Sequence, residues 1–349
     1  MRNRTVKKRR KTLGVGVVGL GVGEQHAHAY ARHDRCELRW LHDLSAKQAK
    51  AVRRRLGAGA IAKSYRQILD DDSVDAVSIA SFDDMHFREV KAAFAAGKHV
   101  FVEKPLCRTK GELKTLVAAW KKAGKPHLRS NLVLRAAPVY GWLKKEIESG
   151  RLGDVYAFDG DYLYGRLEKI TGVGAWRQKI RDYSIMAGGG IHLIDLMLWL
   201  TGERPARVST VGNRIATRGT KFRYDDFKAS TFEFPSGLIG RITGNLGCVH
   251  RHHHVVRVFG TKATFVYDDK GPRIHRFHRS RDEGRRATMI RRKALPRHKG
   301  VLIPDFVGGI LAGRDPAPAA WREFDLIAAV AAANEALKRK RPVAIGYMK

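Results

Sequence analysis

Residues 13–23, LGVGVVGLGVG, pass from a short apolar run of strand type into closely spaced glycines, and a helical stretch, EQHAHAYARH, follows. A strand, a tight glycine turn and a helix form a phosphate cradle, because glycines let the backbone approach a pyrophosphate and the helix N-terminus supplies N–H groups. The turn glycines are Gly19, Gly21 and Gly23. A strict GxGxxG would need glycine at position 24, where the chain has Glu24, so the prediction of a dinucleotide site depends on the surrounding sequence.

An acidic residue follows the next apolar segment. CELRWLHD (36–43) ends in Asp43, and 43 − 19 = 24 positions separate it from the first turn glycine. This is close to the spacing of the acid that hydrogen-bonds the adenosine ribose hydroxyls. Its charge would repel a 2′-phosphate, so the sequence favours NAD over NADP. The alternative is that Asp43 is an acidic cap before the helical segment 45–57.

Strand and helix patterns keep alternating along the first half of the chain. Strands are predicted at AVSIA (76–80), HVFVEKP (99–105) and PHLRSNLVLR (126–135), with helices at FREVKAAFAAG (87–97) and TKGELKTLVAAWKKAG (109–124). This order predicts an α/β domain with a doubly wound parallel sheet, whose ligands bind at the carboxyl ends of the strands. VFVEKP places Glu103 and Lys104 at such an end, which favours a functional interpretation over an exposed loop ion pair.

Composition sets broad limits on the class of protein. With 349 residues, two domains are expected, and 67 basic against 34 acidic residues give a net charge of +33. Residues 1–12 carry seven basic groups and no acid, and residues 270–299 carry twelve basic groups and two acids. Such charge attracts polyanions without sequence preference, so non-specific nucleic-acid binding stays open as an alternative. A generally basic surface and a site for an anionic small molecule are the favoured interpretations.

Cysteine usage and hydropathy bear on the compartment. Three cysteines occur without any CxxC spacing, which is typical of a reducing compartment and predicts a cytoplasmic protein. No apolar stretch is long enough to span a membrane, and residues 1–12 are interpreted as a solvated basic tail and not as a secretory signal.

The second half contains a glycine-rich segment before a strongly apolar helix, AGGGIHLIDLMLWL (187–200). The glycines are interpreted as a turn. His192 and Asp195 are three residues apart and share one helical face, and a histidine in a cleft is the usual proton carrier near neutral pH. The alternative is a core histidine whose hydrogen bonds Asp195 satisfies.

Aromatic and basic side chains are mixed in YLYGRLEKITGVGAWRQKIRDYS (162–184). Aromatic rings stack on sugars and cations bind phosphate or carboxylate, so this segment suits an anionic carbohydrate; a solvated loop with anchoring aromatics is the alternative. The candidate substrate-binding residues are Arg135, Tyr164, Lys169, Trp176, Arg177 and His192. In HRHHH (250–254), strand alternation would place His250, His252 and His254 on one face, and no metal is expected there.

Several segments together resemble the Gfo/Idh/MocA family, the relatives of glucose–fructose oxidoreductase and inositol dehydrogenase. They are GLGVGEQHA (19–27), SFDDMH (81–86), AAGKHVFVEKP (95–105), NLVLRAAP (131–138), GRLGDV (150–155), GGGIHLID (188–195) and FGTKAT (259–264). After a basic tail at 1–12, the resemblance implies a Rossmann domain over 13–134. It also implies an α/β substrate-binding and oligomerisation domain over 135–349 with an open, largely antiparallel sheet. Pairing through the outer face of that sheet would give a homodimer or homotetramer, and the last helix could pack back on the first domain.

The resemblance also assigns roles within the site. Lys104 is placed near the nicotinamide and the reacting hydroxyl, Pro105 is expected in cis, and Lys104 and His192 are the expected catalytic pair. The expected supporting residues are Glu103, Asp195 and Tyr183. The expected cofactor-binding residues are Gly19, Gly21, Val22, Gly23, Asp43, Ser81, Phe82, His86, Glu103 and Lys104.

One position departs from the family pattern. Many relatives carry an aspartate four residues before the histidine, where this chain has Gly188. A Lys–Asp–His triad therefore does not carry over, and Asp182 or Tyr183 is a candidate for the missing polar group.

The predicted function is an NAD(P)-dependent dehydrogenase or reductase acting on CH–OH groups of a sugar or polyol, with anionic or nucleotide-linked sugars as attractive substrates. The alternatives are a glycosidase that recycles its NAD and a non-catalytic dinucleotide-binding sensor.

Overall fold

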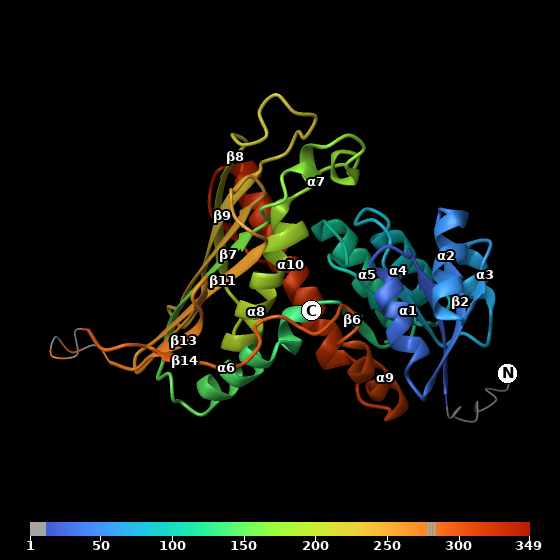
Figure 1. Ribbon diagram of the computed structural model, residues 1–349, viewed down its shortest axis with the longest axis horizontal. Helices are drawn as coiled ribbons and strands as arrows, with labels where there is room; N and C mark the ends of the chain where they lie inside the picture. Colours follow the sequence, from blue (N-terminus) through green and yellow to red (C-terminus); the bar gives the residue numbers. More distant parts are fainter. Residues whose placement is uncertain (1–11, 278, 280, 282–283) are drawn as a thin grey trace. The chain divides into compact units, whose positions relative to one another are not determined.

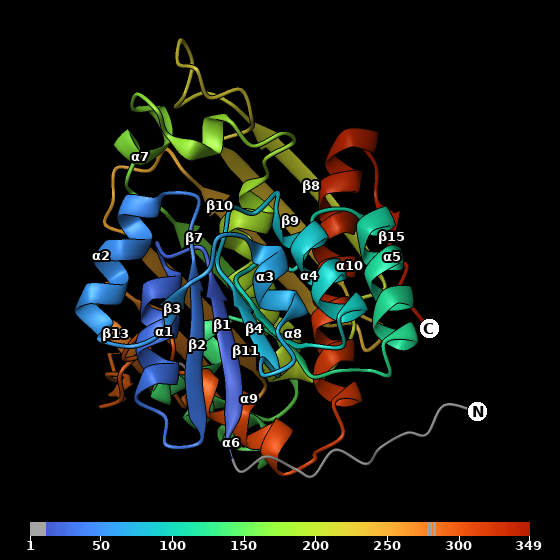
Figure 2. The same ribbon diagram turned by 90° about the vertical axis from the view of Figure 1, so that its right-hand side faces the viewer.

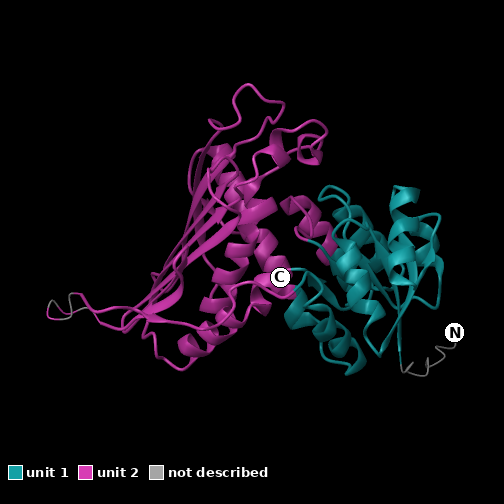
Figure 3. Ribbon diagram, viewed as in Figure 1, with its two compact units in different colours: residues 1–103, 118–131, 298–320 teal, residues 104–117, 132–297, 321–349 magenta. Residues whose placement is uncertain are grey.

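The computed structural model describes residues 12–277, 279, 281 and 284–349. They form two compact units, coloured separately in Figure 3. Unit 1 contains the chain up to Glu103 together with residues 118–131 and 298–320, and unit 2 contains residues 104–117, 132–297 and 321–349. Apart from Thr12, the predicted basic tail lies outside the described residues.

Unit 1 is built on a six-stranded parallel sheet with the order β3-β2-β1-β4-β5-β6. Its elements are β1 (Leu13–Val18), α1 (Gly23–Ala31), β2 (Cys36–His42), α2 (Ala46–Leu56), β3 (Ala60–Ile61), α3 (Tyr65–Asp70), β4 (Ala76–Ile79), α4 (His86–Ala95), β5 (His99–Val102), β6 (Leu128–Ser130) and α9 (Ile303–Leu311), and α5 (Lys110–Lys122) is divided between the units. Strands β2, β1 and β4 lie side by side in Figure 2. The chain passes from β1 outward to β3 on one side and from β4 outward to β6 on the other. The carboxyl ends of the neighbouring strands β1 and β4 are therefore the topological switch point of a doubly wound sheet.

Local sequence explains these elements. All six residues of β1 are buried, as expected for a strand covered on both faces. Helix α2 begins after Ser45, whose side chain accepts a hydrogen bond from the backbone of Gln48, and it ends at Gly57 in the left-handed conformation. The prediction of a parallel α/β domain is therefore confirmed.

The strand predicted over 126–135 is correct only in its first part. Strand β6 ends at Ser130. A 3₁₀ turn, η1 (Val133–Ala136), follows it, and Ala137 separates this turn from Pro138, the first residue of the next helix. A short apolar run does not distinguish a strand from a buried turn, because both bury the same side chains.

Unit 2 contains a nine-stranded sheet with the order β14-β13-β12-β11-β7-β10-β9-β8-β15. Its elements are η1, α6 (Pro138–Glu148), β7 (Val155–Leu163), α7 (Glu168–Thr171), η2 (Trp176–Gln178), η3 (Met186–Gly190), α8 (Ile191–Thr201), β8 (Arg207–Asn213), β9 (Phe227–Glu233), β10 (Ile239–Asn245), β11 (His253–Gly260), β12 (Thr264–Asp268), β13 (Gly271–His275), β14 (Thr288–Met289), α10 (Ala317–Arg339, from Trp321 onward) and β15 (Val343–Ala344). Every strand pair is antiparallel except β7 with β10. Helices α6, α8 and α10 lie along one face of the sheet (Figure 1). The predicted open, largely antiparallel sheet is confirmed.

The glycine segment before α8 is helical, so its interpretation as a turn was wrong. Residues Met186–Gly190 form a π-helical turn, η3, that continues directly into α8, and Gly190 has a φ of −55°. These glycines are used for close approach and not for a left-handed backbone: a Cβ on Gly189 would overlap the ring of Tyr162 on β7.

Within the described residues, no helix has both the length and the apolar character needed to cross a bilayer.

Candidate functional site

The glycine turn of unit 1 has the shape of a phosphate cradle. Gly19 has a φ of +78°, and a Cβ there would stand 2.5 Å from the backbone nitrogen of Ser81, so only glycine fits. A Cβ on Gly23 would press against Ala80 at 3.1 Å, which shows how closely α1 packs on the sheet. At Gly21 a Cβ would meet nothing within 4 Å, and Val22, which precedes α1, is 42% exposed. The backbone at this turn is therefore open to a ligand, and the residues fit a bound pyrophosphate.

Asp43 stands beside this turn at the end of β2. Its Oδ2 accepts a hydrogen bond from the backbone N–H of Leu20 at 2.7 Å, and its Oδ1 accepts one from Ser45 at 2.8 Å. Ser45, not Asp43, is the residue that caps α2. The carboxylate thus joins the glycine turn to the start of α2, the place where a ribose-binding acid is expected.

Ser81, Phe82 and His86 shape the turn between β4 and α4. The Ser81 hydroxyl donates to the carboxylate of Glu89, whose pKa is raised by burial. The Nε2 of His86, which is buried, lies 3.1 Å from the carbonyl oxygen of Ser81. Phe82 is 47% exposed, so it is the side chain that this turn presents outward.

Glu103 is held by a buried polar network that sequence reasoning missed. The amide nitrogen of Asn131 donates to Glu103 Oε1 at 2.7 Å and lies 3.1 Å from His26 Nε2. His26 Nδ1 lies 3.0 Å from the Ser78 hydroxyl, and His26, Ser78 and Asn131 are at most 3% exposed. His26 Nε2 also lies 3.4 Å from Glu103 Oε1, so the imidazole, the amide and the carboxylate form one connected network. Two features of the sequence could have indicated this network: His26 lies in the first turns of α1, and Asn131 directly follows the buried strand β6.

Lys104 opens unit 2 with a hydrogen bond to the helical glycine segment. Its Nζ donates to the carbonyl oxygen of Gly188 at 2.9 Å, and the peptide bond that follows it, Lys104–Pro105, is cis as expected. A Cβ at Gly188 would stand 2.9 Å from Cζ of Tyr183 and still closer to its hydroxyl oxygen. Tyr183 is 5% exposed, whereas the side chain of Asp182 is 72% exposed beside Arg181. Of the two polar candidates, Tyr183 is therefore the one that reaches Gly188.

His192 belongs to a cluster of rings contributed by α8, β7 and β11 with the residues that flank it. Its ring is 5.8 Å from that of His254, at an interplanar angle of 87°. His254 in turn lies 5.3 Å from Tyr162 and 5.2 Å from His252. Across the part of the chain that is described, no group of three or more His, Cys, Asp or Glu residues is arranged to hold a metal ion.

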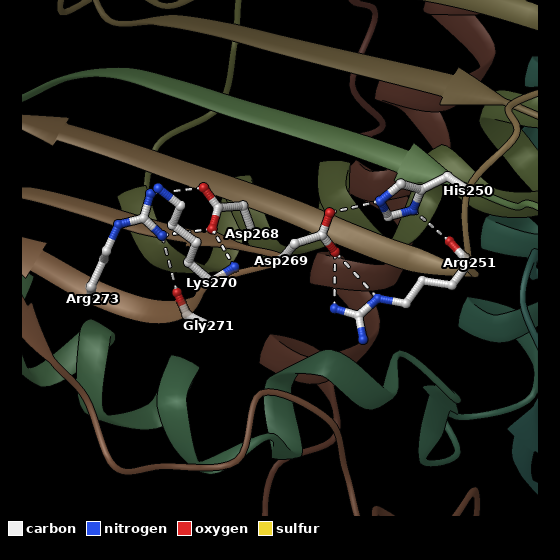
Figure 4. A network of polar contacts seen from close by, with 7 residues as sticks. All are labelled: His250, Arg251, Asp268, Asp269, Lys270, Gly271 and Arg273. Carbon is white, nitrogen blue, oxygen red and sulfur yellow. Dashed lines mark hydrogen bonds and ion pairs between the residues drawn. The ribbon is translucent and has the colours of Figure 1, made fainter.

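His250 does not share this face with His252 and His254, which corrects the expectation from strand alternation. Strand β11 begins only at His253, so the alternation does not extend back to His250. The Nε2 of His250 lies 2.8 Å from Asp269 Oδ2, and the same carboxylate pairs with Arg251 (Figure 4). The hydrogen bond to Asp269 raises the pKa of His250.

Arg135 and Asp195 form a buried ion pair. The Asp195 carboxylate accepts from Nε of Arg135 at 2.8 Å and also from Nη2. The two side chains are 13% and 1% exposed, respectively. Burial opposes the charge of the guanidinium, but the Asp195 carboxylate holds the pKa of Arg135 above its usual value. The structure thus brings a predicted substrate-binding residue and a predicted supporting residue together as partners.

Arg177 is enclosed by aromatic groups. Its guanidinium carbon lies 4.3 Å from the ring centre of Trp176 and 5.2 Å from that of Tyr164. Arg166 approaches the same Tyr164 ring at 5.9 Å. Burial opposes the positive charge of Arg177, but neighbouring tyrosines, Tyr183 foremost, hold its pKa above the usual value.

Lys169, by contrast, is exposed on α7. No hydrogen bond, ion pair or cation–π contact among the described residues joins it to Arg177 or its rings.

Comparisons with known proteins find two family domains along the chain. Residues 13–130 match the model of an oxidoreductase family with an NAD-binding Rossmann fold, and residues 140–266 match the GFO/IDH/MocA C-terminal domain. The chain is 25% identical over 336 residues to inositol 2-dehydrogenase of Acidothermus cellulolyticus, covering 96% of this chain and 95% of that one. It is 26% identical over 291 residues to levoglucosan dehydrogenase of Pseudarthrobacter phenanthrenivorans, covering 74% of each chain.

Solved structures share the fold. A levoglucosan dehydrogenase in complex with NADH superposes with a TM-score of 0.84 at 22% identity, covering 97% of this chain and all of that one. The scyllo-inositol dehydrogenase of Lactobacillus casei gives a TM-score of 0.77 at 20% identity, with 96% and 99% covered. The predictions of fold class, enzyme class and an NAD-binding domain are confirmed, and the chain belongs to the Gfo/Idh/MocA family of oxidoreductases.

Proposed function

We propose that this enzyme oxidises or reduces a CH–OH group of a sugar or polyol with NAD, and that Lys104 and His192 handle the hydroxyl proton. One observation carries the proposal. Lys104 Nζ is anchored to the carbonyl of Gly188, which stands four residues before His192 on one continuous helical segment. Contact of Lys104 with the segment that carries His192 supports the proposal that the amine and the imidazole act in one site.

The chemistry divides between the cofactor and the chain. NAD, when bound, supplies the hydride acceptor, and its reduced form supplies the donor. His192 would take the proton of the substrate hydroxyl, because an imidazole is suited to general acid–base catalysis near neutral pH. The Lys104 ammonium would stabilise negative charge that develops on the substrate oxygen.

Unit 1 contains the groups suited to the cofactor. The open backbone at Gly21 would face the pyrophosphate, and Asp43 would accept from the adenosine ribose hydroxyls. Glu103 is oriented by Asn131 and is a candidate for the nicotinamide ribose. The carboxylate of Asp43 supports NAD over NADP, and exchange of Asp43 for serine is expected to narrow that preference.

The surroundings of Arg177 support a substrate with a negative group. A guanidinium between two aromatic rings offers a stacking surface for a sugar and charged donors for a carboxylate or phosphate. Uronates, sugar phosphates and nucleotide-linked sugars are therefore the favoured substrates. Neutral ring polyols, which resemble the substrates named for the relatives, are the comparison set.

The test is nicotinamide absorbance with NAD and NADP against these compounds, for the wild type and Lys104→Met. Removing one donor that stabilises a developing oxyanion costs about 10²–10³ in kcat, so Lys104→Met should lose at least about a hundredfold in kcat/KM while still binding NAD. Lys114→Met is the matched control, since this lysine is exposed on α5 and is not among the predicted site residues.

Two other outcomes of this assay would support one of the alternative functions. Cleavage of a glycoside without accumulation of NADH would identify the cofactor-recycling glycosidase. Tight NAD binding without turnover of any compound would favour the sensor. Light scattering on the same preparations tests the proposed homodimer or homotetramer.

A further inference from the structure

Two loops of unit 2 are far more basic than the rest of the chain. The first, residues 214–224, lies between β8 and β9, and the second, residues 164–181, follows β7 and contains α7 and η2. Together they carry nine basic residues and one acid, whereas the whole chain has 67 basic and 34 acidic residues. The excess of positive charge in these loops is therefore local, and the composition of the whole chain does not account for it.

A buried carboxylate holds the first loop in one conformation. Asp226, which is 2% exposed, accepts hydrogen bonds from the backbone N–H of Thr217 at 2.7 Å and from its hydroxyl at 2.8 Å. The backbone N–H of Asp226 donates to the carbonyl of Asn213 at 3.0 Å, which closes the base of the loop. A long connection that is packed and hydrogen-bonded in this way is frequently functional.

Aromatic contacts join the first loop to the second. Phe222 is fully buried, and its ring centre lies 5.8 Å from that of Tyr183. The hydroxyl of Tyr224 donates to the carbonyl of Ile180 at 2.7 Å. The two loops accordingly lie close together in both Figure 1 and Figure 2. Their cations form one surface, which we call the basic rim.

The cations of the basic rim are exposed. The first loop presents four of them: Arg214, Arg218, Lys221 and Arg223. The second loop presents four more: Arg166, Lys169, Lys179 and Arg181. Arg181 lies 3.9 Å from Asp182, which is the one ion pair found for these eight cations among the described residues. Such an uncompensated surface attracts ligands that carry several negative charges.

The basic rim adjoins residues already proposed for the site. Tyr183, which packs on Phe222, also reaches Gly188, since a Cβ there would stand 2.9 Å from Cζ of Tyr183. The carbonyl of Gly188 is the acceptor of the Lys104 ammonium. Arg177, proposed for a negative group of the substrate, belongs to the second loop itself. A substrate held at Arg177 would therefore have further cations beside it.

We propose that the basic rim binds the non-reacting part of the substrate, and that this part carries at least two negative charges, as in a sugar linked to a nucleoside diphosphate or in a chain of uronates. This inference rests on the proposed function. The rim takes no part in hydride transfer; it adds affinity and selects substrates by charge. Because its first loop is held by Asp226, little ordering is needed when the ligand binds.

The test is calorimetric binding of three probes to the enzyme loaded with NADH. The probes are glucuronate, uridine diphosphate glucuronate and a trimer of galacturonate; the two larger probes each carry two more negative charges than glucuronate. The rim variant is Arg218→Gln with Lys221→Gln. The matched control is Lys114→Gln with Lys122→Gln, which removes two exposed lysines from α5 and changes the net charge equally.

An exposed ion pair contributes at most about fivefold in affinity, so the rim variant should bind a larger probe about three- to thirtyfold more weakly. Its affinity for glucuronate, and all affinities of the control, should stay within about twofold of the wild type. The loss should diminish as salt is added, because ions screen exposed charges. The probe with the larger loss distinguishes a nucleotide-linked sugar from a chain of uronates.

Three results would overturn the rim. The first is equal losses in the rim and control variants, which would reflect net charge alone. The second is a wild type that binds both larger probes no more tightly than glucuronate. The third is a loss confined to duplex DNA, which would identify a nucleic-acid surface instead. Binding is measured without turnover, so a Lys104→Met enzyme that stays active would overturn the proposed function and leave the measured rim affinity unchanged.

Discussion

The buried pair of Arg135 and Asp195 leads to the most demanding prediction. The perturbation is Arg135→Met, which keeps an unbranched apolar stem of similar reach and removes the guanidinium. It leaves Asp195, whose side chain is 1% exposed, without the two hydrogen bonds that Arg135 donates. Removing one partner of a buried pair costs about 3–5 kcal/mol, because the remaining buried charge loses the opposite charge of its partner. At about 2–4 °C per kcal/mol for a unit of this size, the melting temperature should fall by about 6–20 °C.

The pH dependence of the variant has a definite sign. Burial without a cation raises the pKa of a carboxyl, so Asp195 in the variant should be protonated more readily in the folded than in the unfolded state. A carboxyl whose pKa is raised in the folded state lowers the free energy of unfolding when the pH is above that raised pKa. This loss of stability disappears as the pH falls below the pKa of the unfolded state, about 3.9. The deficit relative to the wild type should therefore be larger at pH 8 than at pH 5.

Urea unfolding and thermal melting at both pH values provide the assay. Arg135→Met combined with Asp195→Leu should recover most of the loss, since replacing a whole buried pair by apolar groups is often neutral. Arg339→Met, in an exposed pair with Glu335 on α10, is the control and should cost at most about 0.5 kcal/mol. A loss below about 1 kcal/mol for Arg135→Met, with no pH dependence, would refute the reasoning.

Three further predictions concern other parts of the chain. Gly19→Ala should abolish NAD binding measured by calorimetry, because the added Cβ would collide with the backbone after β4. Gly97→Ala is the control: Gly97 has a φ of +69° but open space around it, so this variant should lose only about 1–2 kcal/mol of stability. Asn131→Ala should weaken NAD binding about tenfold and destabilise the fold by about 1–3 kcal/mol, since it removes the donor to a buried network; unchanged affinity would show that this network does not position the cofactor site. Asp269→Asn should lower the melting temperature more at pH 5.5 than at pH 9. The raised pKa of His250 adds stability below the unfolded value of about 6.5, which is lost as pH rises through the folded value, whereas the pair of Asp269 with Arg251 is lost at both pH values. An equal decrease in melting temperature at both pH values would exclude the pair of His250 and Asp269 as the cause (Figure 4).

Pattern alone predicted much of the fold. The strand–glycine–helix sequence at 13–31, the alternation that follows it and the placement of Glu103 and Lys104 at a strand end are local features, in which neighbours in the chain are neighbours in space. Such features can be predicted because backbone geometry imposes periods of about 3.6 residues on helices and 2 on strands. The same patterns misled at residues 131–135 and 187–190, where apolar or glycine-rich runs suit more than one backbone conformation.

Contacts across the chain required the tertiary structure. Asn131 and His26 are 105 positions apart, Arg135 and Asp195 are 60 apart, and Lys104 lies 84 positions before Gly188. A sequence gives the chemical type of each of these side chains but not its partner, because long-range pairing is set by how the sheets and helices pack. By itself, the sequence predicted the Rossmann pattern and the cofactor class, and it named the lysine and the histidine that are proposed for the site. Only the packing of η3 against Tyr183 decided that a glycine in this chain makes room for a phenol, since that outcome depends on a distance that no local pattern encodes.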